Sequence, residues 1–305
     1  MQRYILKRVA LAILCVIGVI TIVFLLVRIS GDPVACMMPP EATRQDWEAA
    51  RKTLGLDKPL YVQYGRFLLG VLRCDFGNSI KYDKPCLDIF IQKFPNTLLL
   101  GTVAMFFSIF IGIPVGILSA VKVGSRFDNF SKIFAMLGQA MPVFWAGLML
   151  ILVFAVHLRL LPVAGIGSWR HVLMPAFTLG WFFTAALLRL SRSTMLDVLD
   201  SEYIKMARIK GVPEKLVILK HAWKNASIPV ISLAALNFVF LINGTVITEM
   251  IFAWPGVGRL VVDSIYARDF PMIQACALIS SFMYVFANLI VDVTYAYIDP
   301  RIRYQ

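Results

Sequence analysis

Long apolar runs separated by polar segments dominate the hydrophobic pattern of this chain. The first run covers residues 9–27 and follows three basic residues, Arg3, Lys7 and Arg8. It is too long for the apolar core of a signal peptide and lacks a small-residue cleavage site, so we expect an uncleaved transmembrane helix. A helix needs about 20 apolar residues to cross a bilayer. Runs of about this length recur at residues 97–121, 133–157, 172–190, 228–251 and 273–297.

Residues 30–96 form the one sizeable polar region, and its pattern predicts three short helices. Thr43 is placed to cap a helix that runs to about Leu54, with Asp46 in the capping-box position and Gly55 as its stop. A further short helix is expected over residues 87–94, before Pro95. The middle helix is amphipathic, and its apolar face consists of Tyr61, Tyr64, Phe67, Leu68, Val71 and Leu72.

A basic stretch at residues 201–229 interrupts the apolar runs and predicts two short helices with a break between them. Gly211 can end the first helix in a left-handed conformation, and Pro213 suits the first turn of the next. Because a simple connection between spans needs no amphipathic pattern, we expect a docking element for something outside the membrane. The apolar positions recur at helical spacing, at Tyr203, Met206, Ala207, Ile209, Leu216, Val217 and Leu219.

Composition and charge agree with a membrane protein. The chain is 59% hydrophobic with a mean hydropathy of +0.75, whereas soluble domains average about 45–50% apolar residues. The net charge of +12 is not arranged as a basic stripe with interleaved aromatic residues, which argues against nucleic acid. With a cytoplasmic N-terminus, the cytoplasmic segments hold 16 Lys and Arg in 64 residues and the external ones 13 in 102. This bias follows the positive-inside rule and predicts that both termini are cytoplasmic.

These patterns predict an all-α membrane protein with six transmembrane helices. We divide the chain into an N-terminal transmembrane helix (1–29), an external helical loop region (30–96), a core transmembrane domain (97–297) and a cytoplasmic tail (298–305). The basic stretch falls within a cytoplasmic loop over residues 191–227.

Motifs of a catalytic site are absent from the sequence. There is no Gly-Lys dipeptide, so a Walker A phosphate loop is excluded. His157, His171 and His221 show no metal-ligand spacing, and no motif of a membrane protease or esterase occurs. We therefore expect no enzyme activity, no cofactor and no metal site. A protein of this kind that moves a solute uphill takes its energy from another subunit or from an ion gradient.

The five cysteines do not form a disulfide framework. Cys15 and Cys276 lie within apolar runs and are expected to be buried small hydrophobes. Cys36, Cys74 and Cys86 share one loop, where a Cys74–Cys86 disulfide would close the shortest ring and leave one thiol over. Cys36-Met37-Met38 fits either a soft-metal site or apolar packing beside the membrane.

Polar residues inside the apolar runs are costly in lipid and are the remaining candidates for a site. Asn237, Leu241, Gly244, Thr245 and Thr248 would share one face of a helix over residues 228–251. That face could line a transport path or hydrogen-bond to neighbouring helices. Two acids, Glu249 and Asp292, lie near the ends of their runs, where we expect them to reach the membrane surface or pair with a loop arginine. Gly112 and Gly116 are placed for close approach of another helix.

Several short motifs, in their order and spacing, are similar to those of one family over nearly the full length. The chain resembles the permease subunits of the dipeptide/oligopeptide/nickel class of bacterial ABC importers. The matching segments are Gly31-Asp32-Pro33, Leu54-Gly-Leu-Asp-Lys-Pro59 with Gln63-Tyr64, Asp75-Phe-Gly77, Met141-Pro142 with Phe144-Trp145, Arg192-Ser-Thr-Met-Leu196, Phe252-Ala-Trp-Pro-Gly-Val-Gly-Arg259, Arg268-Asp269-Phe270-Pro271 and Asp299-Pro-Arg-Ile-Arg303.

The resemblance implies the type I ABC importer permease fold, with a cytoplasmic coupling helix that docks on an ATPase subunit. Placing Gly211 on the family's motif glycine puts Lys205-Met206-Ala207 on its Glu-Ala-Ala positions, of which Ala207 alone matches. We expect the buried contact with the ATPase to come from Met206, Ile209, Leu216 and Val217, although some of these could face the membrane surface. The candidate coupling residues are Glu202, Lys205, Met206, Ala207, Ile209, Gly211, Pro213, Leu216 and Val217.

The implied partners are a second homologous permease, two ATP-binding subunits, an external solute-binding protein and membrane lipid, with the chain in the bacterial inner membrane. The implied substrate is a short peptide, with nickel or a metal chelate as the alternative. A stand-alone secondary carrier is the competing class. It is disfavoured because no acid lies near the middle of a span and no internal repeat is found.

Overall fold

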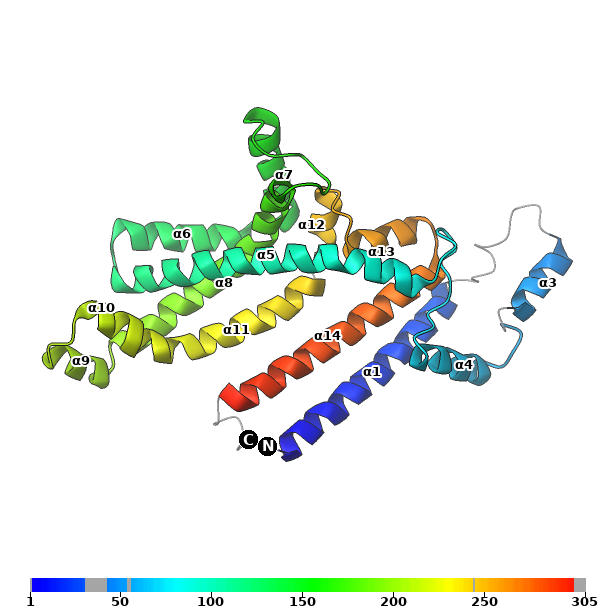
Figure 1. Ribbon diagram of the computed structural model, residues 1–305, viewed down its shortest axis with the longest axis horizontal. Helices are drawn as coiled ribbons and strands as arrows, with labels where there is room; N and C mark the ends of the chain where they lie inside the picture. The colour runs from blue at the N-terminus through cyan, green and yellow to red at the C-terminus, as the bar shows by residue number, and fades with distance from the viewer. Residues whose placement is uncertain (1, 31–42, 54–55, 244, 299–305) are drawn as a thin grey trace. The chain divides into compact units, whose positions relative to one another are not determined.

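The computed structural model describes residues 2–30, 43–53, 56–243 and 245–298. Within these ranges the chain is helical, and its extended structure is limited to an isolated bridge between Asn78 and Pro85 (Figure 1). Five helices are long and apolar enough to cross a membrane, or six if one bent pair counts as a single span. The predicted all-α membrane class is therefore confirmed. The chain divides into two compact units, Met1–Pro95 with Arg259–Gln305, and Asn96–Gly258.

Within the described residues the first unit contains two long helices, two shorter ones, most of α13 (Val257–Tyr266) and the start of α5 (Cys86–Val121). The long helix α1 (Gln2–Ser30) packs along α14 (Phe270–Ile298), and α4 (Leu60–Leu72) packs against α1. The short helix α3 (Arg44–Thr53) agrees with the helix predicted after Thr43. The buried residues at the centre of this packing are Ile20, Val71 and Leu278.

The apolar face of α4 is partly as predicted. Tyr64, Phe67 and Leu68 pack against the Ile20 cluster, whereas Tyr61 and Leu72 are 77% and 72% exposed. Only part of the predicted apolar face therefore contacts α1. Neighbouring helical positions are separated by about 100°, so the stripe that contacts α1 is narrower than the run of apolar residues.

Asp269 joins the segment before α5 to the start of α14. The Asp269 side chain is fully buried, and its carboxylate accepts hydrogen bonds from the N–H groups of Ile80 and Lys81, both at 3.2 Å, and from the Ser79 hydroxyl. It also accepts from the Met272 N–H at 3.2 Å. One carboxylate therefore satisfies free donors at a helix N-terminus and in a loop.

The thiols described by the structure are free. Cys74 is exposed and Cys86 is buried, so the disulfide considered between them does not form. Cys276 is buried as predicted, whereas Cys15 is exposed. The Cys36-Met37-Met38 segment lies outside the described residues, as do residues 31–33, 54–55, 244 and 299–305 of the predicted features.

Helix α5 (Cys86–Val121) is continuous over 36 residues. The sequence predicts a separate helix over residues 87–94 that ends before Pro95, and this prediction is wrong. The φ angle of proline fits a helix. Proline has no backbone N–H, so Pro95 removes one hydrogen bond of α5, but the helix continues. Neighbouring elements of a membrane protein can satisfy the carbonyl that is left free.

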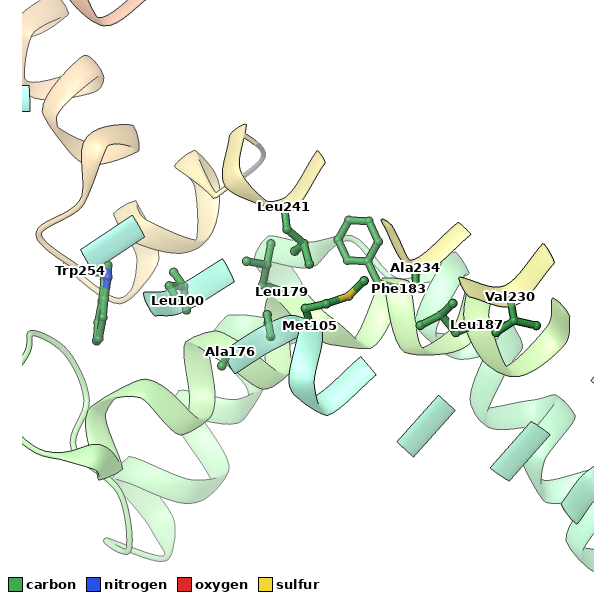
Figure 2. Close-up of a cluster of buried hydrophobic side chains, with 11 residues drawn as sticks. Leu100, Met105, Ala176, Leu179, Phe183, Leu187, Val230, Ala234, Leu241 and Trp254 are labelled. Atoms are coloured by element: carbon green, nitrogen blue, oxygen red, sulfur yellow. The ribbon is translucent and has the colours of Figure 1, made fainter. Parts of the chain in front are cut away.

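The second unit is built around α8 (Trp169–Leu199), the part of α5 from Asn96 onward, and α11 (Trp223–Asn243). Figure 2 shows the side chains of its main core, which come chiefly from these three helices. The core consists of Leu100, Ala104, Met105, Ala176, Leu179, Phe183, Leu187, Val230, Ala234, Leu241 and Trp254.

Helices α5 and α8 approach so closely that their contact requires glycine. A Cβ atom on Gly112 would lie 2.8 Å from the carbonyl oxygen of Thr184, and one on Gly116 would lie 2.6 Å from that of Leu188. Real Cβ atoms do not come this near to backbone atoms. The close approach predicted for these two glycines is therefore confirmed.

The third apolar run forms a bent helix pair instead of one helix. Helix α6 (Arg126–Ala140) is followed by the segment Val143–His157, which consists of α7 (Val143–Leu150) and the π-helix η1 (Ile151–His157). The chain bends by 110° between α6 and this segment. The span predicted over residues 133–157 is therefore divided by a bend at Met141-Pro142, and the pair can still be counted as one span. Met141 is extended, with ψ at 131°, because the residue before a proline is disfavoured in the helical region.

Candidate functional site

The predicted break between two short helices is present in the basic stretch. Helix α9 (Glu202–Ile209) follows α8 after two residues, and α10 (Glu214–Leu216) continues as the π-helix η2 (Val217–Ala222) into α11. We call residues 200–222 the coupling loop.

Gly211 forms the break as predicted. Its φ of 77° is left-handed, and its N–H donates to the Arg208 carbonyl at 3.0 Å. The Val212 N–H donates to the Ala207 carbonyl at 3.2 Å, which closes the C-terminus of α9. Pro213 is the N-cap residue of α10, one position before its first turn.

An ion pair spans the break. The Arg208 guanidinium donates from Nε to Oε2 of Glu214 at 3.1 Å and from Nη2 to Oε1 at 2.8 Å. This bidentate contact raises the pKa of Arg208. Lys205 donates to Glu202 at 3.1 Å, and that hydrogen bond together with the charge of Asp200 raises the Lys205 pKa. Because these groups are largely exposed, they orient the loop more than they stabilise it.

The inner face of the coupling loop packs on α8 and on the end of α5. Ile204 and Val217 are fully buried against Met195 of α8 and Ala120 of α5. Val217 is therefore not available for a contact with another subunit, and its assignment to that contact is wrong. The preceding residue Leu216 is 48% exposed, so the two neighbouring side chains have opposite environments. Ala207 is half-buried beside this cluster.

The outer face of the loop carries large apolar side chains. They are between 45% and 79% exposed, which is unusual for a polar loop and marks a surface suited to a partner. We call this set the coupling face, and it consists of Tyr203, Met206, Ile209, Leu216 and Leu219. Glu202, which the sequence places among the candidates, is exposed at the start of α9.

A cavity of about 290 Å³, open to solvent, lies at the edge between part of the coupling loop and the ends of α5 and α8. Ala120 and Val121 of α5 line one side, and Leu196 and Leu199 of α8 line another. The ion-paired side chains Arg208 and Glu214 complete the lining together with Asp200. The loop is therefore packed tightly through its buried face and loosely at this edge.

A buried carboxylate lies where α5, α6 and α8 meet, and the sequence pattern did not reveal it. The Asp128 side chain is fully buried and accepts from Arg192 of α8 at 2.7 and 3.1 Å. Lys132 pairs with it at 2.8 Å. Ser119 of α5 donates to it at 2.6 Å, and the N–H of Gly124 donates at 3.0 Å. We call these five residues the Asp128 cluster.

A helix-start pattern could have located this cluster. Ser125 caps α6 by accepting from the N–H of Asp128 at 3.1 Å, and Ser-x-x-Asp resembles a capping box. Reading this pattern would have started the helix at Arg126 instead of at residue 133. It would not have identified Arg192, which lies 64 residues away.

The polar face predicted over residues 228–251 does not exist as one helical stripe. Helix α11 ends at Asn243, and the separate helix α12 (Val246–Ile251) follows. Asn237 therefore lies on a different helix from Thr248, and Thr245 is the N-cap residue of α12. Gly244 lies outside the described residues. Buried polar atoms without a hydrogen-bond partner in the described structure include Nδ2 of Asn237 and Oγ1 of Thr248.

Glu249 is fully buried, so its predicted position at the membrane surface is wrong. Its Oε1 accepts hydrogen bonds from the hydroxyls of Thr97 at 2.7 Å and Thr245 at 2.8 Å. A Cβ on Gly256 would lie 2.4 Å from this oxygen, which shows how closely the following loop covers the carboxylate. The N–H of Val257 donates to Thr97 at 2.8 Å and extends the network.

The other predicted acid, Asp292, pairs with an arginine as expected. Its carboxylate lies 3.0 Å from Nη1 of Arg8. Arg8 belongs to α1 and not to a loop. Within the described ranges, no three His, Cys, Asp or Glu side chains gather in a way that could hold a metal ion.

Comparison with known proteins assigns the chain to a family. Residues 112–304 match the family described as "Binding-protein-dependent transport system inner membrane component", and residues 1–101 match the corresponding N-terminal family. The chain is 40% identical over 306 residues to the glutathione transport system permease protein GsiC of Salmonella paratyphi A, with both chains covered completely. The same protein of Escherichia coli K12 matches at 40% identity over the same length.

Solved structures show the same fold. An inward-facing structure of the MetNI methionine ABC transporter superposes with a TM-score of 0.53 at 16% identity, covering 67% of this chain and 95% of that one. A second crystal form gives a TM-score of 0.55 at 16% identity, covering 69% of this chain and 96% of that one.

Proposed function

Because the chain belongs to the family of inner membrane components of binding-protein-dependent transport systems, we propose that this ABC importer permease carries short peptides. The full-length 40% identity to glutathione permeases carries this proposal, since glutathione is itself a tripeptide. The permease would form half of the translocation path, and its domains would follow the division drawn from the sequence. A nickel or metal chelate stays the alternative substrate class.

The proposed partners follow from what the chain lacks and what it exposes. Its sequence contains no Walker A loop, so ATP hydrolysis is assigned to two separate ATP-binding subunits. A second homologous permease would complete the path, and an external binding protein would deliver the solute. Both termini and the coupling loop are assigned to the cytoplasm because Lys and Arg are concentrated in these segments.

We propose that the coupling face docks on the ATPase subunit. Moving a two-state transporter from 1:99 to 99:1 requires about 5.5 kcal/mol of differential binding. Exposed ion pairs supply about 0–1 kcal/mol each, whereas burying an apolar side chain supplies about 1.5–3 kcal/mol. Burial of two or three side chains, such as Met206, Ile209 and Leu216, therefore reaches the required scale. Gly211 and Pro213 would hold the two helices at a constant angle for this contact, with Glu202, Lys205 and Ala207 around it.

The translocation path is proposed to pass the polar residues of α11 and α12. Asn237 and Thr248 support this proposal because each has a buried polar atom without a partner in the described structure. Such atoms are costly unless water or a solute meets them. Thr245 is the less direct candidate, since it donates to Glu249, and Gly244 stays a prediction.

A charge on the coupling face tests the docking role. Ile209 is 79% exposed, so Ile209→Glu should leave folding intact while preventing burial of this position against an ATPase. We expect glutathione-stimulated ATP hydrolysis by the reconstituted complex to fall at least about tenfold, the factor equivalent to 1.4 kcal/mol. Gly211→Pro should act in the same direction, because proline cannot adopt a positive φ.

The matched control is Ile166→Glu, the same change at a 47% exposed position outside the coupling loop. Membrane insertion should be unchanged in all variants. Unchanged stimulated hydrolysis in Ile209→Glu would contradict the docking role. Uptake by vesicles that contain this chain alone and no ATP would instead identify a secondary carrier.

A further inference from the structure

The Asp128 cluster connects three helices of the second unit through one buried charge. Ser119 lies near the end of α5, Gly124 in the following turn, Lys132 on α6 and Arg192 on α8. Charge-assisted hydrogen bonds are about twice as strong as neutral ones. Because Asp128 is fully buried, separating α6 from α8 would leave a desolvated carboxylate without its main partner.

Helix α8 leads directly from this cluster to the coupling loop. Arg192 lies seven residues before Leu199, the last residue of α8, which is about 10 Å along the helix axis. Ser201 is already the N-cap residue of α9. The loop is also fastened to α8 from the side, because Ile204 and Val217 pack on Met195. A displacement of the loop is therefore transmitted to α8.

The coupling loop contacts α5 less closely than it contacts α8. The cavity of about 290 Å³ lies between Ala120 and Val121 of α5 and the pair formed by Arg208 and Glu214. Along this edge the loop does not press on α5, and its direct packing on that helix is limited to the buried cluster around Ala120. The Asp128 cluster supplies a second connection, from α8 back to α5 and α6.

We propose that Asp128, held by Arg192 and Lys132, is a positioning residue that makes α5 and α6 follow α8 when the coupling face is displaced. This inference rests on the proposed docking of an ATPase subunit. Asp128 adds a charged connection to the packing of α5 and α6 on α8, and its loss uncouples ATP hydrolysis from transport.

Two variants separate transmission from simple stability. Asp128→Asn alone leaves the half-buried Arg192 guanidinium without its carboxylate and should lower the thermal unfolding midpoint. Adding Arg192→Met removes that guanidinium and retains its apolar stem, and such paired replacement of buried ions is often neutral for stability. In the double variant the amide oxygen introduced at position 128 can still accept from the Gly124 N–H, and its NH2 group can donate to the Ser119 hydroxyl, but the connection to α8 is absent.

The reconstituted complex with its partner subunits is assayed with glutathione as the transported probe. We expect the double variant to unfold near the wild-type temperature while the glutathione transported per ATP falls at least about fivefold, the lower end of typical coupling between sites. Asp197→Asn is the matched control, since it makes the same change at an exposed position of α8, and it should keep the wild-type ratio.

A double variant that regains both its stability and the wild-type ratio would overturn the inference, because the cluster would then be structural. Wild-type complex that neither hydrolyses ATP in response to glutathione nor takes it up would overturn the proposed function, and the inference with it. Low transport with low hydrolysis in the folded double variant would also overturn it, since uncoupling requires that hydrolysis continue.

Discussion

At the residue scale, glycine determines how closely α5 and α8 approach. Gly112 and Gly116 of α5 face α8, and Gly180 of α8 faces α5, where a Cβ would lie 2.7 Å from the Ala104 carbonyl oxygen. The same contact allows the Ser108 hydroxyl to donate to the Gly180 carbonyl at 2.9 Å. Close packing and interhelical hydrogen bonds are what hold helices together when lipid provides no hydrophobic driving force.

Gly116→Ala should therefore destabilise the permease. The new methyl would lie 2.6 Å from a backbone oxygen, which cannot move without shifting α8, so we expect a loss of about 1–3 kcal/mol. Thermal unfolding of the purified subunit measures this loss of unfolding free energy. Gly18→Ala on α1 is the control, because nothing lies within 4 Å of its added Cβ. Equal unfolding temperatures for the two variants would contradict this account.

Glu249 shows how a buried acid is held by hydroxyls at the residue scale. Glu249→Leu would leave the donors of Thr97 and Thr245 without this acceptor, and each unsatisfied buried donor costs about 1–3 kcal/mol. Glu249→Gln retains a carbonyl oxygen at the same place. The unfolding temperature should therefore be highest for the wild type, lower for Glu249→Gln and lowest for Glu249→Leu. A Leu variant as stable as the Gln variant would refute the role of the network.

At the element scale, α4 is held on α1 by one stripe of side chains. The Tyr64 ring packs edge-on against Phe24 with centroids 5.2 Å apart, and its hydroxyl lies 2.9 Å from that of Thr21. The Tyr61 ring is 77% exposed. Two tyrosines three residues apart therefore have very different environments on the same helix.

Tyr64→Ala should weaken the attachment of α4, whereas Tyr61→Ala should not. We expect Tyr64→Ala to lower the free energy of unfolding by about 2–3 kcal/mol. This is less than the roughly 3–5 kcal/mol for a fully buried aromatic residue, because Tyr64 is only partly buried. Exposed substitutions usually stay within about 0.5 kcal/mol. Limited proteolysis at residues 56–59 together with thermal unfolding would report the difference. Similar cleavage rates for both variants would count against the packing.

At the scale of the whole molecule, orientation in the membrane decides what the coupling loop can contact. The positive-inside bias assigns it to the cytoplasm, and the region with Cys74 to the outside. Cys74 is an exposed free thiol, and Lys210 is exposed in the coupling loop. We therefore predict that these two positions lie on opposite sides of the membrane.

A membrane-impermeant maleimide should label Cys74 in cells whose inner membrane is intact. A Lys210→Cys variant in a Cys74→Ser background should react after the inner membrane is opened and not before. Cys36→Ser in both proteins removes the other loop thiol from the signal. The reverse order of labelling would place the coupling loop outside and exclude its docking on a cytoplasmic ATPase.

Much of the fold could be predicted because lipid imposes long, simple patterns. A run of about 20 apolar residues must be helical in a bilayer, so α1, α5, α8, α11 and α14 follow from the sequence. The left-handed Gly211 and the close contacts of Gly112 and Gly116 could also be predicted, because glycine has a local physical signature at such places.

The errors occur where a contact between distant residues overrides the local pattern. The sequence predicts a helix end at Pro95, yet α5 continues through it. Val217 fits an outward face by spacing, but packing against Met195 buries it. Glu249 lies near the end of an apolar run, and its burial depends on Thr97, which is 152 residues away.

The sequence by itself determined the membrane class, the approximate spans, the absence of an ATP-binding loop and the break at Gly211. These features depend on hydrophobicity, on charge and on backbone geometry within a few residues. The tertiary structure alone decided which coupling-loop side chains are exposed and that Asp128, Arg192 and Ser119 meet. Burial and ion pairing depend on how helices pack, and no local pattern of the chain contains that information.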